Sequence, residues 1–184
     1  LDSFDYFFGA INYGGSVTEG WVMGQGTPNI MRLYAIHALV LPHSFHLMKV
    51  NTAFVGLGAI YLCYRAAVNF LGREDRRVFY AMLLCPSSLL WSSTLGKDPL
   101  VLFGISVYIF GVARWYRHGG ILSIAIMGAG IVGAMFIRVW LGPILLAPMA
   151  AFALSRLRGG PAKLLLIGAM GGAFLFSIQR FQDR

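Results

Sequence analysis

The sequence predicts an all-α membrane protein, a polytopic bundle of about six or seven transmembrane helices. Three observations lead to this prediction. Of the 184 residues, 58% are hydrophobic and only 12% are charged, against about 25% charged in soluble domains. The mean hydropathy is +0.70. The basic residues stand in short clusters between long apolar runs. A water-soluble domain of this size cannot hide so much apolar surface, so lipid is the expected solvent.

The predicted membrane helices follow from apolar runs that approach the roughly 17–25 residues needed to cross a bilayer. These runs are 52–70, 78–95, 99–113, 121–138, 140–155 and 163–178. Several are short, so we expect tilted helices. An earlier apolar segment, 31–48, is interrupted by Arg32, Pro42 and three histidines. It is either a seventh span or a helix lying at the membrane interface.

Small residues predict where these helices touch. Gly128, Gly130 and Gly133 fall in one apolar run, and Gly168 and Gly172 fall in the last one. A helix face of small residues lets a second backbone approach closely in a membrane. We therefore expect tight helix packing at these glycines.

Charge in the loops predicts which side each faces. Every second loop is basic, through Arg73, Arg76, Arg77, Arg114, Arg117, Arg156, Arg158 and Lys163. By the positive-inside rule these loops are cytoplasmic in a multi-pass protein. The opposite side then receives an outer loop region, 1–30, ahead of a transmembrane domain, 31–184. It also receives the Lys97–Asp98 turn and Arg138. Because the chain starts at Leu1 without a signal peptide, we expect a mature or truncated piece of a longer protein.

The Lys97–Asp98 turn is the main candidate site. Asp98 can cap a helix that begins at Pro99. Lys97 is harder to explain, since a cation at a helix N-terminus opposes the helix dipole. A bound anion such as phosphate would account for it, and Ser92, Ser93 and Thr94 would add hydroxyl donors. Arg138 is either a second cation for that anion or a side chain that snorkels to the interface.

Two further groups of residues could carry chemistry. Asp2 and Asp5 are three residues apart, a spacing that suits a base or a metal ligand on one helix face, although a solvated terminus explains them equally simply. His37, His43 and His46 match no standard ligand spacing. We therefore predict no metal site.

Several short motifs carry a family resemblance. They are Gly26-Thr27-Pro28 with Arg32-Leu33, Tyr64-Arg65-Ala66, the run from Pro86 to Ser93 followed by Gly96-Lys97-Asp98, and Ile137-Arg138 with Pro143. Over about 26–158 the chain resembles a family of bacterial polytopic membrane proteins. These proteins are usually labelled uncharacterised, glycosyltransferase-like or polysaccharide-polymerase-like.

The resemblance implies a C-type glycosyltransferase-like or polymerase-like fold, of which this chain can be a fragment, in the bacterial cytoplasmic (inner) membrane. It implies a polyprenyl-phosphate sugar as donor and no other cofactor. Enzymes of that fold keep a catalytic carboxylate in the first outer loop, where Asp2 and Asp5 stand. The chain departs from the family pattern at Val139, which replaces the proline after Arg138, and in having no span before Asp2.

Two functions are the main hypotheses from the sequence; a transporter is a third, for which the spans carry few charges and no clear inverted repeat. The first is a glycosyltransferase or polysaccharide polymerase that binds an anionic lipid head near Lys97 and Arg138. The alternative is a non-catalytic transmembrane subunit that packs within a larger membrane complex. The expected partners are membrane lipids and, for the alternative, other membrane-protein subunits. The net charge of +8 does not predict nucleic-acid binding, because the basic residues form loop-sized clusters.

Overall fold

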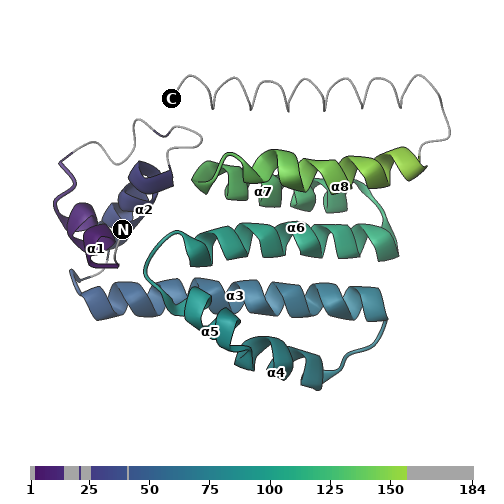
Figure 1. Ribbon diagram of the computed structural model, residues 1–184, viewed down its shortest axis with the longest axis horizontal. Helices are drawn as coiled ribbons and strands as arrows, with labels where there is room; N and C mark the ends of the chain where they lie inside the picture. Colours follow the sequence, from purple (N-terminus) through teal and green to yellow (C-terminus); the bar gives the residue numbers. More distant parts are fainter. Residues whose placement is uncertain (1–2, 15–20, 22–25, 41, 157–184) are drawn as a thin grey trace.

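A computed structural model describes residues 3–14, 21, 26–40 and 42–156. Within these residues the chain forms eight α-helices and no strand (Figure 1). The helices are α1 (Ser3–Ile11), α2 (Gly26–Val40), α3 (Phe45–Leu71), α4 (Arg76–Leu84), α5 (Pro86–Ser93), α6 (Asp98–His118), α7 (Ile121–Ile137) and α8 (Leu141–Arg156). The all-α prediction is confirmed for the part of the chain that the structure describes.

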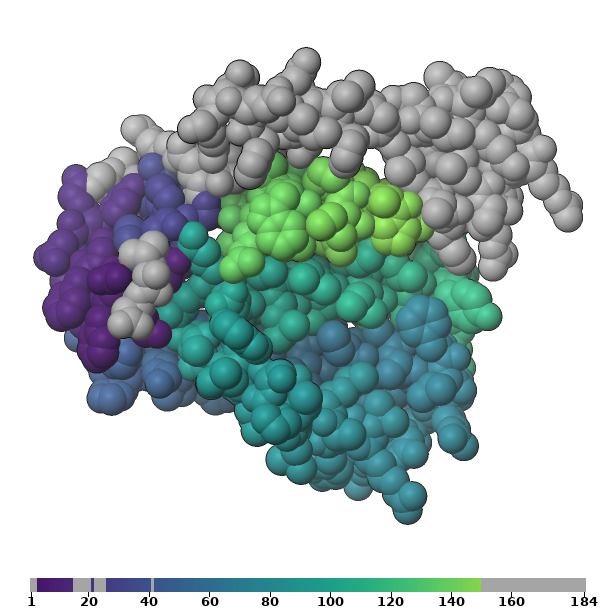
Figure 2. Space-filling view, viewed as in Figure 1, coloured from purple at the N-terminus to yellow at the C-terminus, as the bar shows by residue number. Residues whose placement is uncertain are grey.

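The long helices form a bundle. Helices α3, α6, α7 and α8 run side by side with nearly parallel axes, and α6 packs against both α3 and α7 (Figure 1). Helices α1 and α2 gather where α3, α6 and α8 begin and where α7 ends. We call this the α1–α2 end of the bundle, and it forms the left of the space-filling view (Figure 2). The opposite end carries the C-termini of α3, α6 and α8.

Helix α3 owes its length to well-formed ends. The Ser44 side chain accepts a hydrogen bond from the backbone N–H of Leu47 at the N-cap. At the other end Gly72 adopts the left-handed conformation, φ 72°, and its N–H donates to the carbonyl of Val68. Glycine takes this conformation without the steric cost that a Cβ brings.

The segment 78–95 was expected to be one span and is not. It contains two short helices, α4 with 9 residues and α5 with 8, separated at Cys85. Cys85 is extended, φ −61° and ψ 121°, because a proline disfavours the α conformation in the residue before it. Pro86 then opens α5, at a position where its missing N–H costs nothing. Neither helix is long enough to cross a bilayer alone.

Two other boundaries also differ from the sequence prediction. The segment 31–48 is not one helix, since α2 ends at Val40 and α3 begins at Phe45. The outer region 1–30 is not all loop: α1 lies within it and α2 starts there. The predicted span 163–178, with Gly168 and Gly172, lies outside the described residues.

Two of the described helices, α3 with 27 residues and α6 with 21, are long and apolar enough to cross a membrane. Helix α7 is apolar but shorter, with 17 residues. Large apolar side chains remain on the surface, among them Phe54 at 65% exposure and Ile121 at 85%. Length and composition therefore support membrane association, while the number of six or seven spans stays a prediction.

Glycine sets the separation of α6 and α7. A Cβ on Gly130 would lie 2.4 Å from the backbone nitrogen of Tyr108, and one on Gly104 would lie 2.9 Å from that of Ala134. Side-chain carbons are not found so close to backbone atoms. Gly128 and Gly133, in contrast, have open space at the Cβ position. Of the three predicted packing glycines on α7, Gly130 alone faces a neighbouring backbone in the described part of the chain.

Candidate anion-binding site

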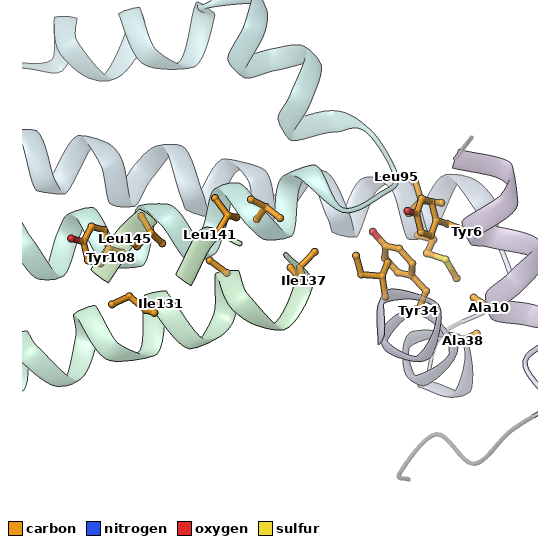
Figure 3. Close-up of a cluster of buried hydrophobic side chains, with 14 of the residues drawn as sticks. Tyr6, Ala10, Tyr34, Ala38, Leu95, Tyr108, Ile131, Ile137, Leu141 and Leu145 are labelled. Carbon is orange, nitrogen blue, oxygen red and sulfur yellow. The ribbon is translucent and has the colours of Figure 1, made fainter. Parts of the chain in front are cut away.

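The turn between α5 and α6 is anchored at its centre. Leu95 is 2% exposed and packs in the buried cluster that also holds Tyr6 and Tyr34 (Figure 3). The hydroxyl of Tyr34 donates a hydrogen bond to the carbonyl of Gly96 over 3.1 Å. Thr52 on α3 places its own hydroxyl 3.3 Å from that of Tyr34. Three helices therefore hold the turn that carries Lys97 and Asp98.

Removing the Tyr34 hydroxyl should loosen this turn. Because Tyr34 is 5% exposed, Tyr34→Phe leaves the buried carbonyl of Gly96 without its partner, a loss of about 1–3 kcal/mol. We expect a lower midpoint of thermal unfolding and faster amide exchange at Gly96 and Lys97. Tyr61→Phe, at an exposed tyrosine of α3, is the control. Equal midpoints for the two variants would show that the Tyr34 bond does not hold the turn.

The turn between α7 and α8 is fixed by α2. The side-chain amide of Asn29 donates to the carbonyl of Phe136 over 3.1 Å. A Cβ on Gly26 would lie 2.2 Å from the carbonyl oxygen of Ile137. Only glycine therefore fits at this point, and the beginning of α2 rests directly on the end of α7. Arg138, which follows Ile137, is thereby positioned beside the α5–α6 turn.

An ion pair joins the two turns. Arg138 Nη2 lies 3.1 Å from Asp98 Oδ1, and the side chains are 38% and 36% exposed. Asp98 is the first residue of α6, and Lys97 stands at its N-cap without a side-chain cap hydrogen bond. The expectation that Asp98 caps the helix is therefore corrected: its carboxylate bonds to Arg138 instead. A carboxylate in the first turn still interacts favourably with the helix dipole.

Lys97 points toward the beginning of α2. Its ammonium donates a hydrogen bond to Thr27 Oγ1 over 2.5 Å, and it would lie 3.7 Å from a Cβ on Gly26. Burial lowers the pKa of Lys97, the positive charge of Arg138 lowers it further, and Asp98 opposes both effects. The lysine thus sits where its own charge is disfavoured.

Tyr6 on α1 also lies beside Thr27, the hydrogen-bond partner of Lys97. It is 4% exposed and hydrogen-bonds to Thr27, which lies between it and Lys97. Burial is the main cause that raises the pKa of Tyr6, and the negative charges of Asp98 and Asp5 raise it further. The phenol is therefore neutral at physiological pH and can donate a hydrogen bond.

These groups surround a cavity of about 390 Å³ at the α1–α2 end of the bundle. We call it the Lys97 cavity. It is lined by Ser3, Tyr6, Trp91, Thr94, Leu95, Gly96, Lys97, Asp98 and Arg138. The structure thus brings together Lys97, Asp98 and Arg138, which are up to 41 positions apart in the sequence.

Two of the three predicted hydroxyl donors lie elsewhere. Ser92 is buried against α3, where a Cβ on Gly56 would come within 2.4 Å of the Ser92 carbonyl oxygen. The hydroxyls of Ser92 and Ser93 donate to carbonyls within α5, at 3.3 Å each. Neither residue lines the Lys97 cavity. Its lining hydroxyls come from Ser3, Tyr6 and Thr94, of which the sequence predicted Thr94 alone.

Of the two predicted catalytic carboxylates, the structure describes one, Asp5. Asp2 lies outside the described residues. Asp5 is exposed on α1 and does not line the cavity, whereas the next residue, Tyr6, does. Among the described lining residues Asp98 is the one carboxylate.

The charge balance around the cavity favours an anion. Lys97 and Arg138 bring two positive charges, and Asp98 neutralises one of them. Helix α6 begins at the cavity, at Asp98, and α2 begins at Gly26, whose Cβ position would lie 3.7 Å from the Lys97 ammonium. A helix N-terminus carries the equivalent of about half a positive charge and free N–H donors. The described part of the site is therefore net positive.

Comparisons of the chain with protein-family models, with curated proteins and with solved structures find no match. No group of three or more His, Cys, Asp or Glu side chains that could hold a metal ion occurs among the residues that the structure describes. The chemistry of the Lys97 cavity is therefore the basis for assigning a function.

Proposed function

We propose that this chain is an integral membrane protein that binds the phosphate head of a lipid in the Lys97 cavity. We further propose that it acts as a polyprenyl-phosphate-sugar-dependent glycosyltransferase or polysaccharide polymerase. The observation that carries the proposal is the meeting of Lys97, Arg138 and the N-terminus of α6 at one cavity. Only one carboxylate opposes them among the described lining residues.

The two cations suit phosphate in different ways. Arginine presents a planar fork of N–H donors that can hold two phosphate oxygens, while lysine supplies a compact point charge. Lys97 uses one of its three donors on Thr27, so two remain for a ligand. The N–H groups in the first turn of α6 add donors that need no side chain, although Pro99 contributes none.

The membrane setting is supported by the distribution of charge along the bundle. Arg73, Arg76, Arg114 and Arg117 all belong to the end opposite the Lys97 cavity, where α3 and α6 finish (Figure 1). If that end is cytoplasmic, as the positive-inside rule requires, the cavity faces the outer side. Polyprenyl-linked sugars used on that side would reach it from the bilayer.

The proposed reaction is a sugar transfer. The oxygen of an acceptor hydroxyl attacks the anomeric carbon, and the bond from that carbon to the phosphate oxygen breaks. The departing lipid phosphate keeps the electron pair, and Lys97 and Arg138 stabilise its charge. A carboxylate takes the acceptor proton. The resemblance assigns this role to Asp2 or Asp5, of which Asp5 does not line the cavity.

The proposal is tested by binding in detergent micelles. Farnesyl phosphate should bind the purified full chain at least about tenfold more tightly than farnesol, which has the same tail and no phosphate. Equal affinities would refute the anion site. Stoichiometric copurification of a membrane partner, with no binding of farnesyl phosphate, would instead support the non-catalytic subunit.

Binding should also depend on pH through Lys97. Its pKa lies below the ordinary value of 10.5, because burial and Arg138 disfavour the charged form. Affinity for farnesyl phosphate should therefore fall as pH rises from 7 toward 10, before an ordinary lysine would titrate. Lys97→Arg, which keeps its charge at all these pH values, should show a flat profile over the same range. A flat profile for the unaltered protein would contradict the role of Lys97.

A further inference from the structure

The Lys97 cavity holds an anion of its own. Asp98 lines the cavity beside Lys97 and is bonded to Arg138, the residue proposed to bind phosphate. A ligand phosphate must therefore compete with this carboxylate for the guanidinium. The inference below depends on the proposed function, because it concerns how the phosphate enters that site.

We propose that the Asp98 carboxylate occupies the phosphate position on Arg138 until a ligand displaces it, and that the freed carboxylate then accepts a hydrogen bond from a hydroxyl of the same ligand. The ligand class that satisfies both groups is a phosphate ester with hydroxyls near the phosphate, as in a lipid-linked sugar. Asp98 thereby becomes a residue that determines specificity.

Solvent exposure lowers the free-energy cost of separating Asp98 from Arg138. Both side chains of the pair are more than a third exposed, and ion pairs of this kind contribute little to protein stability. A phosphate offers more acceptor oxygens than a carboxylate and can accept two parallel hydrogen bonds from one edge of the guanidinium. The cation–π contact of Arg138 with Trp140, 5.8 Å to the ring centroid, can hold the guanidinium near the cavity during the exchange.

The backbone keeps the displaced carboxylate within the cavity. Asp98 is the first residue of α6, and Pro99, which follows it, is fully buried. The Asp98 side chain can therefore turn about its own bonds while its backbone stays in place. A carboxylate that leaves Arg138 within a partly buried site needs new donors. Hydroxyls of a sugar attached to the phosphate would supply them at short range.

The test compares two probes on Asp98→Asn. Farnesyl phosphate lacks hydroxyls, and farnesyl phosphoglucose carries a sugar on its phosphate. Removal of the competing carboxylate should tighten binding of farnesyl phosphate roughly threefold to tenfold. Farnesyl phosphoglucose should gain little or lose affinity, because its hydroxyls lose the carboxylate that accepts them. The preference for the sugar-bearing probe should therefore shrink in the variant.

A double-mutant cycle separates exchange from simple charge removal. In an Arg138→Ala background there is no guanidinium for which the Asp98 carboxylate and the phosphate compete. Asp98→Asn should then no longer tighten the binding of farnesyl phosphate. A gain of equal size in both backgrounds would overturn the exchange, since it would reflect a through-space charge effect. Unchanged preference between the probes would overturn the hydroxyl contact.

Controls keep the outcomes distinct. Glu74→Gln breaks the Arg65–Glu74 ion pair, 2.8 Å long, far from the cavity and should change neither affinity. Asp98→Ser, also neutral and well accepted at a helix start, serves as a second variant if Asp98→Asn does not fold. If the unaltered protein binds neither probe, the proposed function fails. If the unaltered protein binds both probes and the Asp98 variants bind them with the same affinities, the proposed function stands and this inference alone fails.

Discussion

Lys97→Ala should weaken binding of farnesyl phosphate by about tenfold to a hundredfold. The substitution removes a charge-assisted hydrogen bond, a contribution of about 1.5–3 kcal/mol. It also removes one of the two cations lining the cavity. Folding should survive, because the Lys97 ammonium has one hydrogen bond, to Thr27, and burial already disfavours its charge. Titration of the variant in the same micelles measures the loss.

The matched control is Lys49→Ala. Lys49 is an exposed lysine near the start of α3, and it does not line the Lys97 cavity. Both variants lower the net charge by one, so a general electrostatic effect would weaken them equally. A loss in Lys97→Ala alone assigns the effect to the cavity. Equal losses, or no loss in either variant, would contradict the assignment.

Gly130→Ala should destabilise the bundle by about 1–3 kcal/mol, the usual cost of overpacking. The new methyl group would lie 2.4 Å from the backbone nitrogen of Tyr108 and 2.8 Å from the carbonyl oxygen of Gly104. Both are backbone atoms of α6, so relief requires α6 and α7 to move apart. Because α7 ends at Arg138, that movement should also weaken phosphate binding.

Gly128→Ala is a control that should change the stability of the bundle in the opposite direction. It lies on the same helix, two residues away, with nothing within 4 Å of an added Cβ. Alanine is favoured over glycine within a helix by up to about 1 kcal/mol. Thermal unfolding in detergent should therefore show a lower midpoint for Gly130→Ala and an equal or higher one for Gly128→Ala. A midpoint that falls in both variants, or in neither, would contradict the close packing of α6 and α7.

The fold class and several helices followed from composition and apolar runs, since α3, α6, α7 and α8 all lie close to predicted runs. The break at Cys85 was missed because the run 78–95 is apolar throughout its first half, and hydropathy does not register the conformational effect of Pro86. Helix α1 was missed for a different reason. It is nine residues long and lies outside any span-length run.

The site was only partly predictable. Lys97 and Arg138 were singled out because charges are rare in this chain, and a rare charge needs a partner. Arg138 reaches Asp98, the residue after Lys97, only because α2 packs against the end of α7 at Gly26 and Asn29. No local pattern encodes that packing. Tyr6 could not be foreseen at all, because one tyrosine in an aromatic segment does not reveal which way it faces.

The most direct measurement is an experimental structure of the full chain in lipid nanodiscs with farnesyl phosphate. The account predicts density for the phosphate in the Lys97 cavity, within hydrogen-bond distance of Lys97 Nζ and the Arg138 guanidinium. Asp98 should then be turned away from Arg138. Phosphate density at the opposite end of the bundle, near Arg65 or Arg114, with the Asp98–Arg138 pair intact, would contradict it.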